Sequence, residues 1–381
     1  MADDTETTKA ALLARRPSLV VPDENLLSSG STMLNLGCSG RIDGATFKGG
    51  YFYLVGDSSS GKTWITMAFF AEANINRNFD KHRFVYDNAE NGALMDLEAF
   101  FGERMAARMQ PPNGTWDDPR NSVTIEEFYY NLTALQKAGK PFIYALDSMD
   151  ALTSKDDEAH HDKEARAFAR TLKDLDEEAA DTAPAEEKVK GSYGVSRAKK
   201  NSGRMRVVVN RLRDTGSVLI VLGQTRDNIG FGSQYQPKTR SGGTSLTFYA
   251  HHEVWLSRGG TLRRYVKGKD RKVGIVSRAD VEKSRLTGRE VQVSTHIRYS
   301  VGVDDVSSMI AYLTDEGVWK LKGDKGAKTV TAPEFDFHGK LEDLADHITE
   351  EGEERTLQAL VSKRWKEVEE AMRVTRRNRY V

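Results

Sequence analysis

The chain has 381 residues, enough for one large domain with appendages or for two modest domains. Hydrophobic residues make up 38% and charged residues 29%, which excludes a disordered chain, and a formal net charge of +0 predicts no partner. The single cysteine, Cys38, excludes an intrachain disulfide and a cysteine-based zinc site. The N-terminus is acidic and polar, and no apolar run approaches the ~20 residues that cross a bilayer, so we expect a cytoplasmic protein.

Apolar runs of strand length alternate with helical patterns through the first two thirds of the chain. The first 27 residues read as a polar arm with a short helix at 10–15, and this arm could contact a neighbouring subunit. Five expected strands lie at 51–55, 84–87, 142–147, 218–223 and 254–256, and expected helices at 63–73 and 160–179 separate some of them. Several strands are apolar throughout, which is typical of strands buried on both faces. The pattern predicts an α/β fold with a mainly parallel central sheet.

The chain changes character after residue 250. Apolar and polar residues alternate at 291–297, which predicts a half-buried strand near the sheet edge. A glycine- and lysine-rich linker at 323–328 follows, and beyond it two apolar stripes predict a small helical module at 329–381. We therefore expect one α/β core domain at 28–322.

The strongest motif in the chain is a phosphate-binding loop between the first strand and the first long helix. Its residues are Gly56, Asp57, Ser58, Ser59, Ser60, Gly61, Lys62 and Thr63, with Trp64 next in the binding segment. In such a loop the glycines allow backbone N–H groups to surround phosphates at a helix N-terminus. Lys62 is expected to reach the β- and γ-phosphates of ATP, and the Thr63 hydroxyl is expected to bind Mg²⁺.

Two carboxylates at later strand ends complete the predicted hydrolytic site. Asp147 ends an apolar run and is expected to orient Mg²⁺, although it could instead cap the turn after the strand. Glu90 follows the second strand and is the candidate for positioning the attacking water, although it could be a solvated loop acid.

These motifs resemble those of the RecA family of strand-exchange ATPases, from about residue 28 to about residue 298. The similar segments are SGSTMLN at 29–35, the loop at 56–63, DNAE at 87–90, LDSMDAL at 146–152, VLIVLGQTR at 218–226, GGTSLTFYA at 242–250 and VEKSR at 281–285. The resemblance implies that Gln224 senses the γ-phosphate. It also implies that Lys283 and Arg285 reach the ATP of a neighbouring subunit, although they could be solvated positions on an exposed strand.

The resemblance further implies two DNA-binding loops, at 183–203 and 226–240. Basic residues in such loops neutralise phosphates, and aromatic residues can stack on bases. The candidate DNA contacts are Lys188, Lys190, Arg197, Lys199, Lys200, Arg226, Phe231, Lys238, Arg240, Gly242 and Gly243. The same charge runs are also compatible with solvated surface loops.

The expected function is that of a DNA-dependent ATPase with ATP and Mg²⁺ as cofactors. It would form a helical filament on single-stranded DNA and promote pairing and strand exchange with double-stranded DNA. The N-terminal arm, the long basic segment after residue 181 and the basic C-terminus depart from the bacterial members, as in a divergent phage recombinase of the UvsX kind, for which the compartment is the host cytoplasm. Two alternatives are a ring-forming helicase or translocase of the same fold, and a nucleotide-gated annealing or mediator protein.

Overall fold

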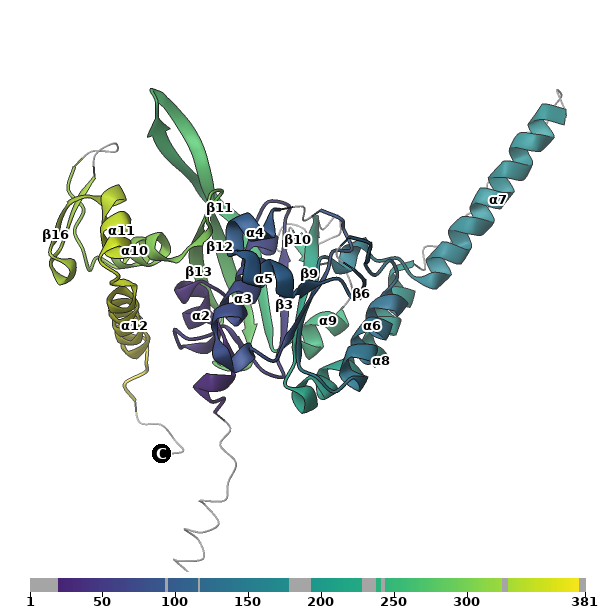
Figure 1. The fold of residues 1–381 in the computed structure, drawn as a ribbon, viewed down its shortest axis with the longest axis horizontal. Coiled ribbons are helices and arrows are strands. Elements are labelled where there is room, and N and C mark those ends of the chain that lie inside the picture. The colour runs from purple at the N-terminus through teal and green to yellow at the C-terminus, as the bar shows by residue number, and fades with distance from the viewer. Residues whose placement is uncertain are drawn as a thin grey trace, which may run out of the picture.

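The computed structural model describes residues 20–92, 95–115, 117–177, 193–227, 238–240, 244–323 and 328–376, and for some of these the backbone alone. Its centre is a large sheet covered by helices (Figure 1). The strand order is β14 (Gly302–Asp304), β13 (Val291–Arg298), β12 (Lys269–Ser284), β11 (His252–Val266), β3 (Tyr51–Gly56), β9 (Val218–Asp227), β8 (Phe142–Leu146), β4 (Arg83–Asp87) and β5 (Met109–Gln110). A further strand, β10 (Lys238–Arg240), pairs with β9.

The strands from β11 to β5 run parallel, whereas β12, β13 and β14 pair antiparallel. The five predicted strands correspond to β3, β4, β8, β9 and β11, and the alternating segment at 291–297 corresponds to β13. The predicted α/β fold with a mainly parallel sheet is thereby confirmed. Parallel strands need crossover connections, and these supply the helices on both faces.

Side chains of β3 alternate between two hydrophobic cores, because successive residues of a strand point to opposite faces. Phe52 and Leu54 enter the core on the side of α3 (Lys62–Ile75), and Tyr53 enters the core on the side of α6 (Ile125–Lys137). The first core also takes in α2 (Thr32–Ser39), α5 (Glu103–Arg108) and α10 (Asp305–Asp315), and the second takes in α8 (Tyr193–Thr215) and α9 (Thr244–Tyr249). Burial on both faces fixes the position of the loop that follows β3.

The lone cysteine lies in α2, within the first core. Its side chain is fully buried, and burial raises the pKa of the Cys38 thiol far above its ordinary value. The thiol therefore stays protonated at neutral pH.

The chain ends depart from the predictions in two ways. Leu26 and Leu27 are buried and form β1, which pairs with β2 (Thr46–Phe47), so the end of the predicted arm belongs to the packed body. The predicted helix at 10–15 lies outside the described residues. The expected helical module contains α11 (Leu341–Glu350) and α12 (Glu354–Ala371), but also a hairpin of β15 (Thr329–Ala332) and β16 (Phe337–Lys340).

Two elements project from the body (Figure 1). One is α7 (Lys155–Glu177), which corresponds to the predicted helix at 160–179 over the residues that the structure describes, and here Phe168 is 66% exposed. The other is the hairpin of β11 and β12, whose turn at Lys267 and Gly268 has positive φ at both residues, as two-residue hairpin turns often require. Among the described residues, no helix is both long and apolar enough to cross a membrane.

Candidate active site

The phosphate-binding loop joins the end of β3 to the start of α3, as predicted. Gly61 has φ of 100°, and an added Cβ there would collide with Ile297 of β13. The Ser277 hydroxyl of β12 donates a hydrogen bond to the main-chain oxygen of Ser60, at 2.6 Å. Contacts with β12 and β13 therefore hold the loop. At its end lie the N–H groups of the first turn of α3, which have no partner within the helix.

Lys62 folds back over the loop. Its Nζ donates to the main-chain oxygens of Gly56 and Asp57, at 2.8 Å each. Burial lowers the pKa of Lys62, and the carboxylates of Asp147, Glu90, Asp57 and Asp150 oppose that shift. The charge of Lys62 thus interacts with four acids. A phosphate bound in the loop would meet this cation.

Trp64 contributes differently from the rest of the motif. Its indole packs edge-to-face against Phe100, with ring centroids 5.0 Å apart, and covers Gly302. The side chain of Trp64 is thus engaged in packing, and its backbone N–H in the first turn of α3 is the group suited to a phosphate.

Asp147 and Thr63 meet beside the loop. The Thr63 hydroxyl donates to Asp147 Oδ2 at 3.0 Å, and the hydroxyl of Tyr86, from β4, donates to the same oxygen at 2.7 Å. Asp147 is 5% exposed, and burial raises its pKa while these two hydrogen bonds oppose the rise. A carboxylate beside a hydroxyl at a phosphate loop is a ligand set suited to Mg²⁺ held together with substrate phosphates.

Glu90, Ser148 and Gln224 come together from three strand ends. The Gln224 side chain donates from Nε2 to Glu90 Oε1 at 2.6 Å, and the Ser148 hydroxyl donates to the same oxygen. Glu90 itself remains solvent-exposed. The structure therefore places both predicted residues together, while the part of Ser148 was not foreseen because a serine after a strand carries no distinguishing pattern.

Lys283 and Arg285 lie at the opposite end of the sheet. In the strand register Lys283 pairs with Glu253, which lies beside Tyr53, three residues before Gly56. Three residues of strand span about 10 Å, and the phosphate loop lies beyond that distance. Lys283 donates to the main-chain oxygens of Thr247 and Phe248, at 2.7 and 3.0 Å, and Arg285 donates to that of Phe248 at 2.9 Å.

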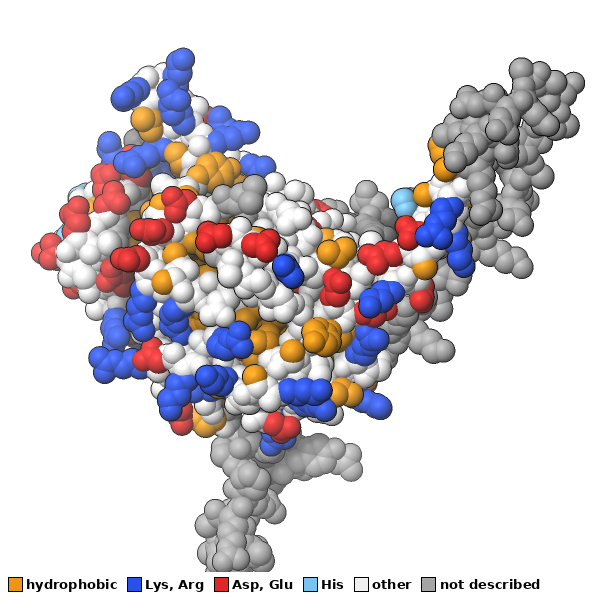
Figure 2. All heavy atoms as spheres, turned by 45° about the vertical axis from the view of Figure 1, so that its right-hand side comes forward, with side chains coloured by type: hydrophobic (Ala, Val, Ile, Leu, Met, Phe, Trp, Pro, Cys, Tyr) orange, Lys and Arg blue, Asp and Glu red, His pale blue; other side chains and the backbone are white. Residues whose placement is uncertain are grey.

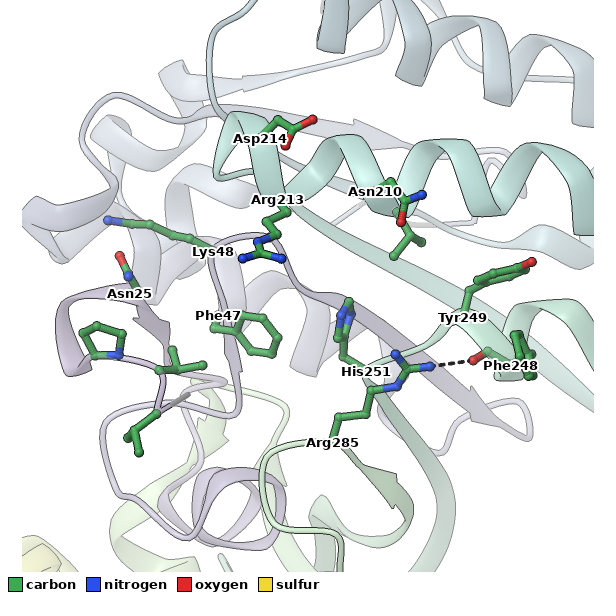
Figure 3. Close-up of a pocket in the computed structure, with 15 residues that line it drawn as sticks. Asn25, Phe47, Lys48, Asn210, Arg213, Asp214, Phe248, Tyr249, His251 and Arg285 are labelled. Carbon is green, nitrogen blue, oxygen red and sulfur yellow. Dashed lines mark hydrogen bonds between the residues drawn. The ribbon is translucent and has the colours of Figure 1, made fainter. Parts of the chain in front are cut away.

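Arg285 faces a cavity of about 920 Å³ (Figure 3). Arg213, from α8, and His251 approach the same cavity, and Phe47 forms part of its wall. His251 Nδ1 accepts a hydrogen bond from the backbone N–H of Tyr51 at 3.0 Å. Burial, together with the charges of Arg285 and Lys283, lowers the pKa of His251 to about 4.

The predicted DNA-binding residues are only partly described. Lys188, Lys190, Phe231, Gly242 and Gly243 lie outside the described residues. Arg197, Lys199 and Lys200 belong to α8, which begins at Tyr193, so the expectation of a loop up to residue 203 is wrong.

The second expected loop is also ordered at both ends. Residues 225–227 of β9 pair with 238–240 of β10, so Arg226, Lys238 and Arg240 lie in a β-ladder, described as backbone. Side-chain contacts of the predicted DNA-binding residues therefore stay predictions.

A basic surface that no motif indicated lies at the tip of the β11–β12 hairpin. It consists of six exposed cations, with Asp270 as the one acid between residues 263 and 272: Arg263, Arg264, Lys267, Lys269, Arg271 and Lys272. Figure 2 shows basic side chains gathered on this projection. Because β11 runs parallel to β3 and continues past Gly56, the tip lies beyond the end of the sheet that carries the phosphate loop.

Two of the known proteins that are similar in sequence are RecA proteins. Protein RecA of Colwellia psychrerythraea strain 34H is 26% identical over 330 residues, covering 81% of this chain and 79% of that protein. Protein RecA of Tropheryma whipplei strain Twist is 30% identical over 124 residues, covering 32% of this chain and 27% of that protein. No family model matches the chain.

Among solved structures, the crystal structure of the RadB recombinase superposes with a TM-score of 0.44 and 14% identity. The superposition covers 73% of this chain and 98% of that chain. A superposition this loose supports no conclusion about function.

Proposed function

Because the chain is a divergent member of the RecA family, we propose that it is an ATP-dependent recombinase that assembles on single-stranded DNA and promotes strand exchange. The observation that carries this proposal is the meeting of Lys62, Asp147, Glu90 and Gln224 at one end of the sheet. These residues come from four separate elements. A lysine, a buried carboxylate and an exposed carboxylate around a phosphate loop form the set that ATP hydrolysis needs.

Each residue has a role that its contacts support. Lys62 would leave the oxygens of its own loop for the β- and γ-phosphates. Thr63 and Asp147 would hold Mg²⁺, which when bound offsets phosphate charge. Glu90, the exposed carboxylate, would accept a hydrogen bond from the attacking water. Gln224, which already contacts Glu90, would report the presence of the γ-phosphate to β9.

The position of Lys283 and Arg285 supports a role in trans. Neither can reach the phosphate loop of its own chain along the strand register described above. A neighbour stacked with its sheet end against this one could present both cations to a nucleotide, as an arginine finger does. Such head-to-tail contacts build filaments when the rotation does not close.

The proposed DNA partner finds support in the basic hairpin tip. Its cations are exposed, so they can neutralise backbone phosphates without a desolvation cost, and such contacts do not depend on base sequence. Sequence reading during strand exchange belongs to base pairing between strands.

One experiment separates this proposal from its rivals. ATP turnover is measured with and without single-stranded DNA, and the same samples are imaged by electron microscopy. The recombinase proposal requires DNA-stimulated turnover, open filaments and formation of joint molecules from homologous duplex. Closed rings with translocation along DNA would favour a helicase, and annealing that survives Glu90→Gln without turnover would favour a mediator protein.

A further inference from the structure

Two consecutive residues at the base of the β9–β10 pair are held by carboxylates from three different loops. The backbone N–H of Gln224 donates to Asp150 Oδ2 at 2.6 Å, and its side chain donates to Glu90. The Thr225 hydroxyl donates to Asp57 Oδ1, within the phosphate loop. Thr225 also begins the ladder with β10, opposite Arg240.

The strand register explains why this point is shared. Gln224 lies beside Gly56, the last residue of β3, so β9 continues past β3 just where the phosphate loop starts. Asp57 is the second residue of that loop, and Asp150 lies in the short 3-10 helix η3 (Met149–Ala151) that follows β8 on the other side of β9. Carboxylates on both flanks therefore hold the segment at which the β9–β10 pair leaves the sheet.

Asp57 differs from Asp150 in what nucleotide would do to it. Asp57 belongs to the phosphate loop itself, and Lys62 Nζ donates to its main-chain oxygen, whereas the charge of Lys62 attracts the carboxylates of both Asp57 and Asp150. When Lys62 turns to bound phosphates, its attraction for the Asp57 carboxylate falls, and this carboxylate, which lies in the loop that surrounds the phosphates, gains anionic neighbours. Both changes raise the free energy of the carboxylate in its present position and therefore favour its movement away from the phosphates and from the Thr225 hydroxyl.

We propose that Asp57 and Asp150 are positioning residues, with Asp150 a fixed anchor and the Asp57–Thr225 bond a nucleotide-sensitive link to the β9–β10 pair. This rests on the proposed function only in assuming that nucleotide phosphates bind the loop. Asp150 keeps the Gln224 backbone in place so that its side chain stays on Glu90. Loss of the Asp57 bond loosens the ladder that begins at the next residue.

The test is hydrogen exchange of the full chain without DNA, followed by mass spectrometry, with and without Mg²⁺ and a slowly hydrolysed ATP analogue. In the natural protein the analogue should slow exchange at residues 57–63 and speed exchange at 225–227 and 238–240 by about fivefold. That factor is what one hydrogen bond of ordinary strength accounts for. Thr225→Val, which removes the hydroxyl at nearly constant shape, should show the faster ladder exchange already without nucleotide and no further change.

Matched variants make the test specific. Thr225→Ser keeps the hydroxyl, Thr239→Val changes an exposed threonine on the partner strand, and both should behave as the natural protein does. Asp57→Asn keeps an acceptor but removes the charge, so hydrogen exchange in the β9–β10 ladder of this variant should stay slow after nucleotide binds. Asp150→Ala should speed ladder exchange in both states while the response to nucleotide remains.

The failures are distinguishable. No protection at residues 57–63 would contradict the proposed nucleotide site, and the comparison of Thr225→Val with Thr225→Ser would still test the bond itself. If residues 57–63 are protected but the exchange rate at 225–227 and 238–240 is unchanged in the natural protein, the proposed link is overturned. The same holds if Thr225→Val and Thr225→Ser have equal exchange rates at these residues.

Discussion

The two ends of β3 lie in opposite electrostatic environments. At the carboxyl end, burial lowers the pKa of Lys62, and four carboxylates oppose this shift. At the amino end, burial lowers the pKa of His251 and the cations Arg285 and Lys283 push it lower still. One end is therefore rich in negative charge and the other in positive charge, and the strand keeps them apart within a single chain. In the proposed filament, the two ends of neighbouring chains would complement each other.

The largest expected effect comes from removing the positive end. Lys283→Ala with Arg285→Ala should lower DNA-stimulated turnover by about 10³-fold, the scale of a charge supplied in trans to phosphoryl transfer. Lys62→Ala should also be inactive. When the two inactive proteins are mixed on DNA, some interfaces pair an intact phosphate loop with intact cations, so part of the activity should return.

The control for that experiment is co-assembly. Filaments must be shown to contain both proteins, for example by two fluorescent labels. If such filaments show no ATP turnover at any mixing ratio, the two cations do not act on the ATP of a neighbouring subunit. The proposed complementarity of the two ends would then be wrong.

The next largest effect tests the negative end. Glu90→Gln should lower turnover about 10²-fold, because the amide is a poor acceptor for a water proton. Nucleotide binding, measured with a fluorescent ATP analogue, should change little. Asp157→Asn, at an acidic position early in α7, is the matched control, and normal turnover in Glu90→Gln would remove Glu90 from the proposed role.

A smaller effect concerns the basic hairpin that extends past the negative end. Replacing Arg264, Lys269 and Lys272 by glutamine should weaken binding of single-stranded DNA at all sequences. The slope of log affinity against log salt should fall by up to about 2, because each lost phosphate contact removes about 0.7. The same change at the exposed Lys81, Lys137 and Lys140 is the control, and an equal loss in both variants would show that only overall charge matters.

The smallest effect is on stability. The His251 pKa is lowered from 6.5 to about 4, so the fold favours the neutral ring. The resulting stabilisation is present above pH 6.5 and is lost as the pH falls toward 4. His251→Asn, whose amide oxygen can still accept from Tyr51, should flatten the fall in unfolding free energy over this range by up to about 1.4 kcal/mol per pH unit.

Denaturant titrations at several pH values measure this slope. Burial also lowers the pKa values of His82 and His252, and these residues should account for slope that remains in the variant. The exposed His161→Asn serves as the control. A slope that is the same in the natural protein and in His251→Asn would contradict the lowered pKa of His251, which burial and the two cations together produce.

The sequence predicts the negative end well because its residues follow strands. Parallel strands bring their carboxyl ends to one edge, so Asp147, Glu90 and Gln224 had to meet near Lys62 once the strands were recognised. Their partners were not predictable, since the bonds from Tyr86 and Ser148 depend on side-chain direction and not on spacing. The hydrogen bond between Thr225 and Asp57 depends on which strands are neighbours in the sheet. No local sequence pattern predicts this strand order.

Outside the sheet centre the signals weaken. Only 254–256 of β11 reads as a strand, because past Leu256 the strand leaves the core and its residues no longer alternate by burial. The pairing with β12 is carried instead by a two-residue turn and main-chain hydrogen bonds. The first residues of α8 are basic and polar in sequence, so hydrophobic periodicity predicts this helix only from Met205 onward.

The burial of Cys38 has a practical consequence for studying this molecule. Its protonated, enclosed thiol should be inert to maleimide reagents, since thiolate is the reactive form. A cysteine placed at the exposed Lys140 would then be the one site that takes a dye, with no native cysteine removed beforehand. Subunits labelled in this way with donor and acceptor dyes would report assembly and disassembly on DNA, one molecule at a time.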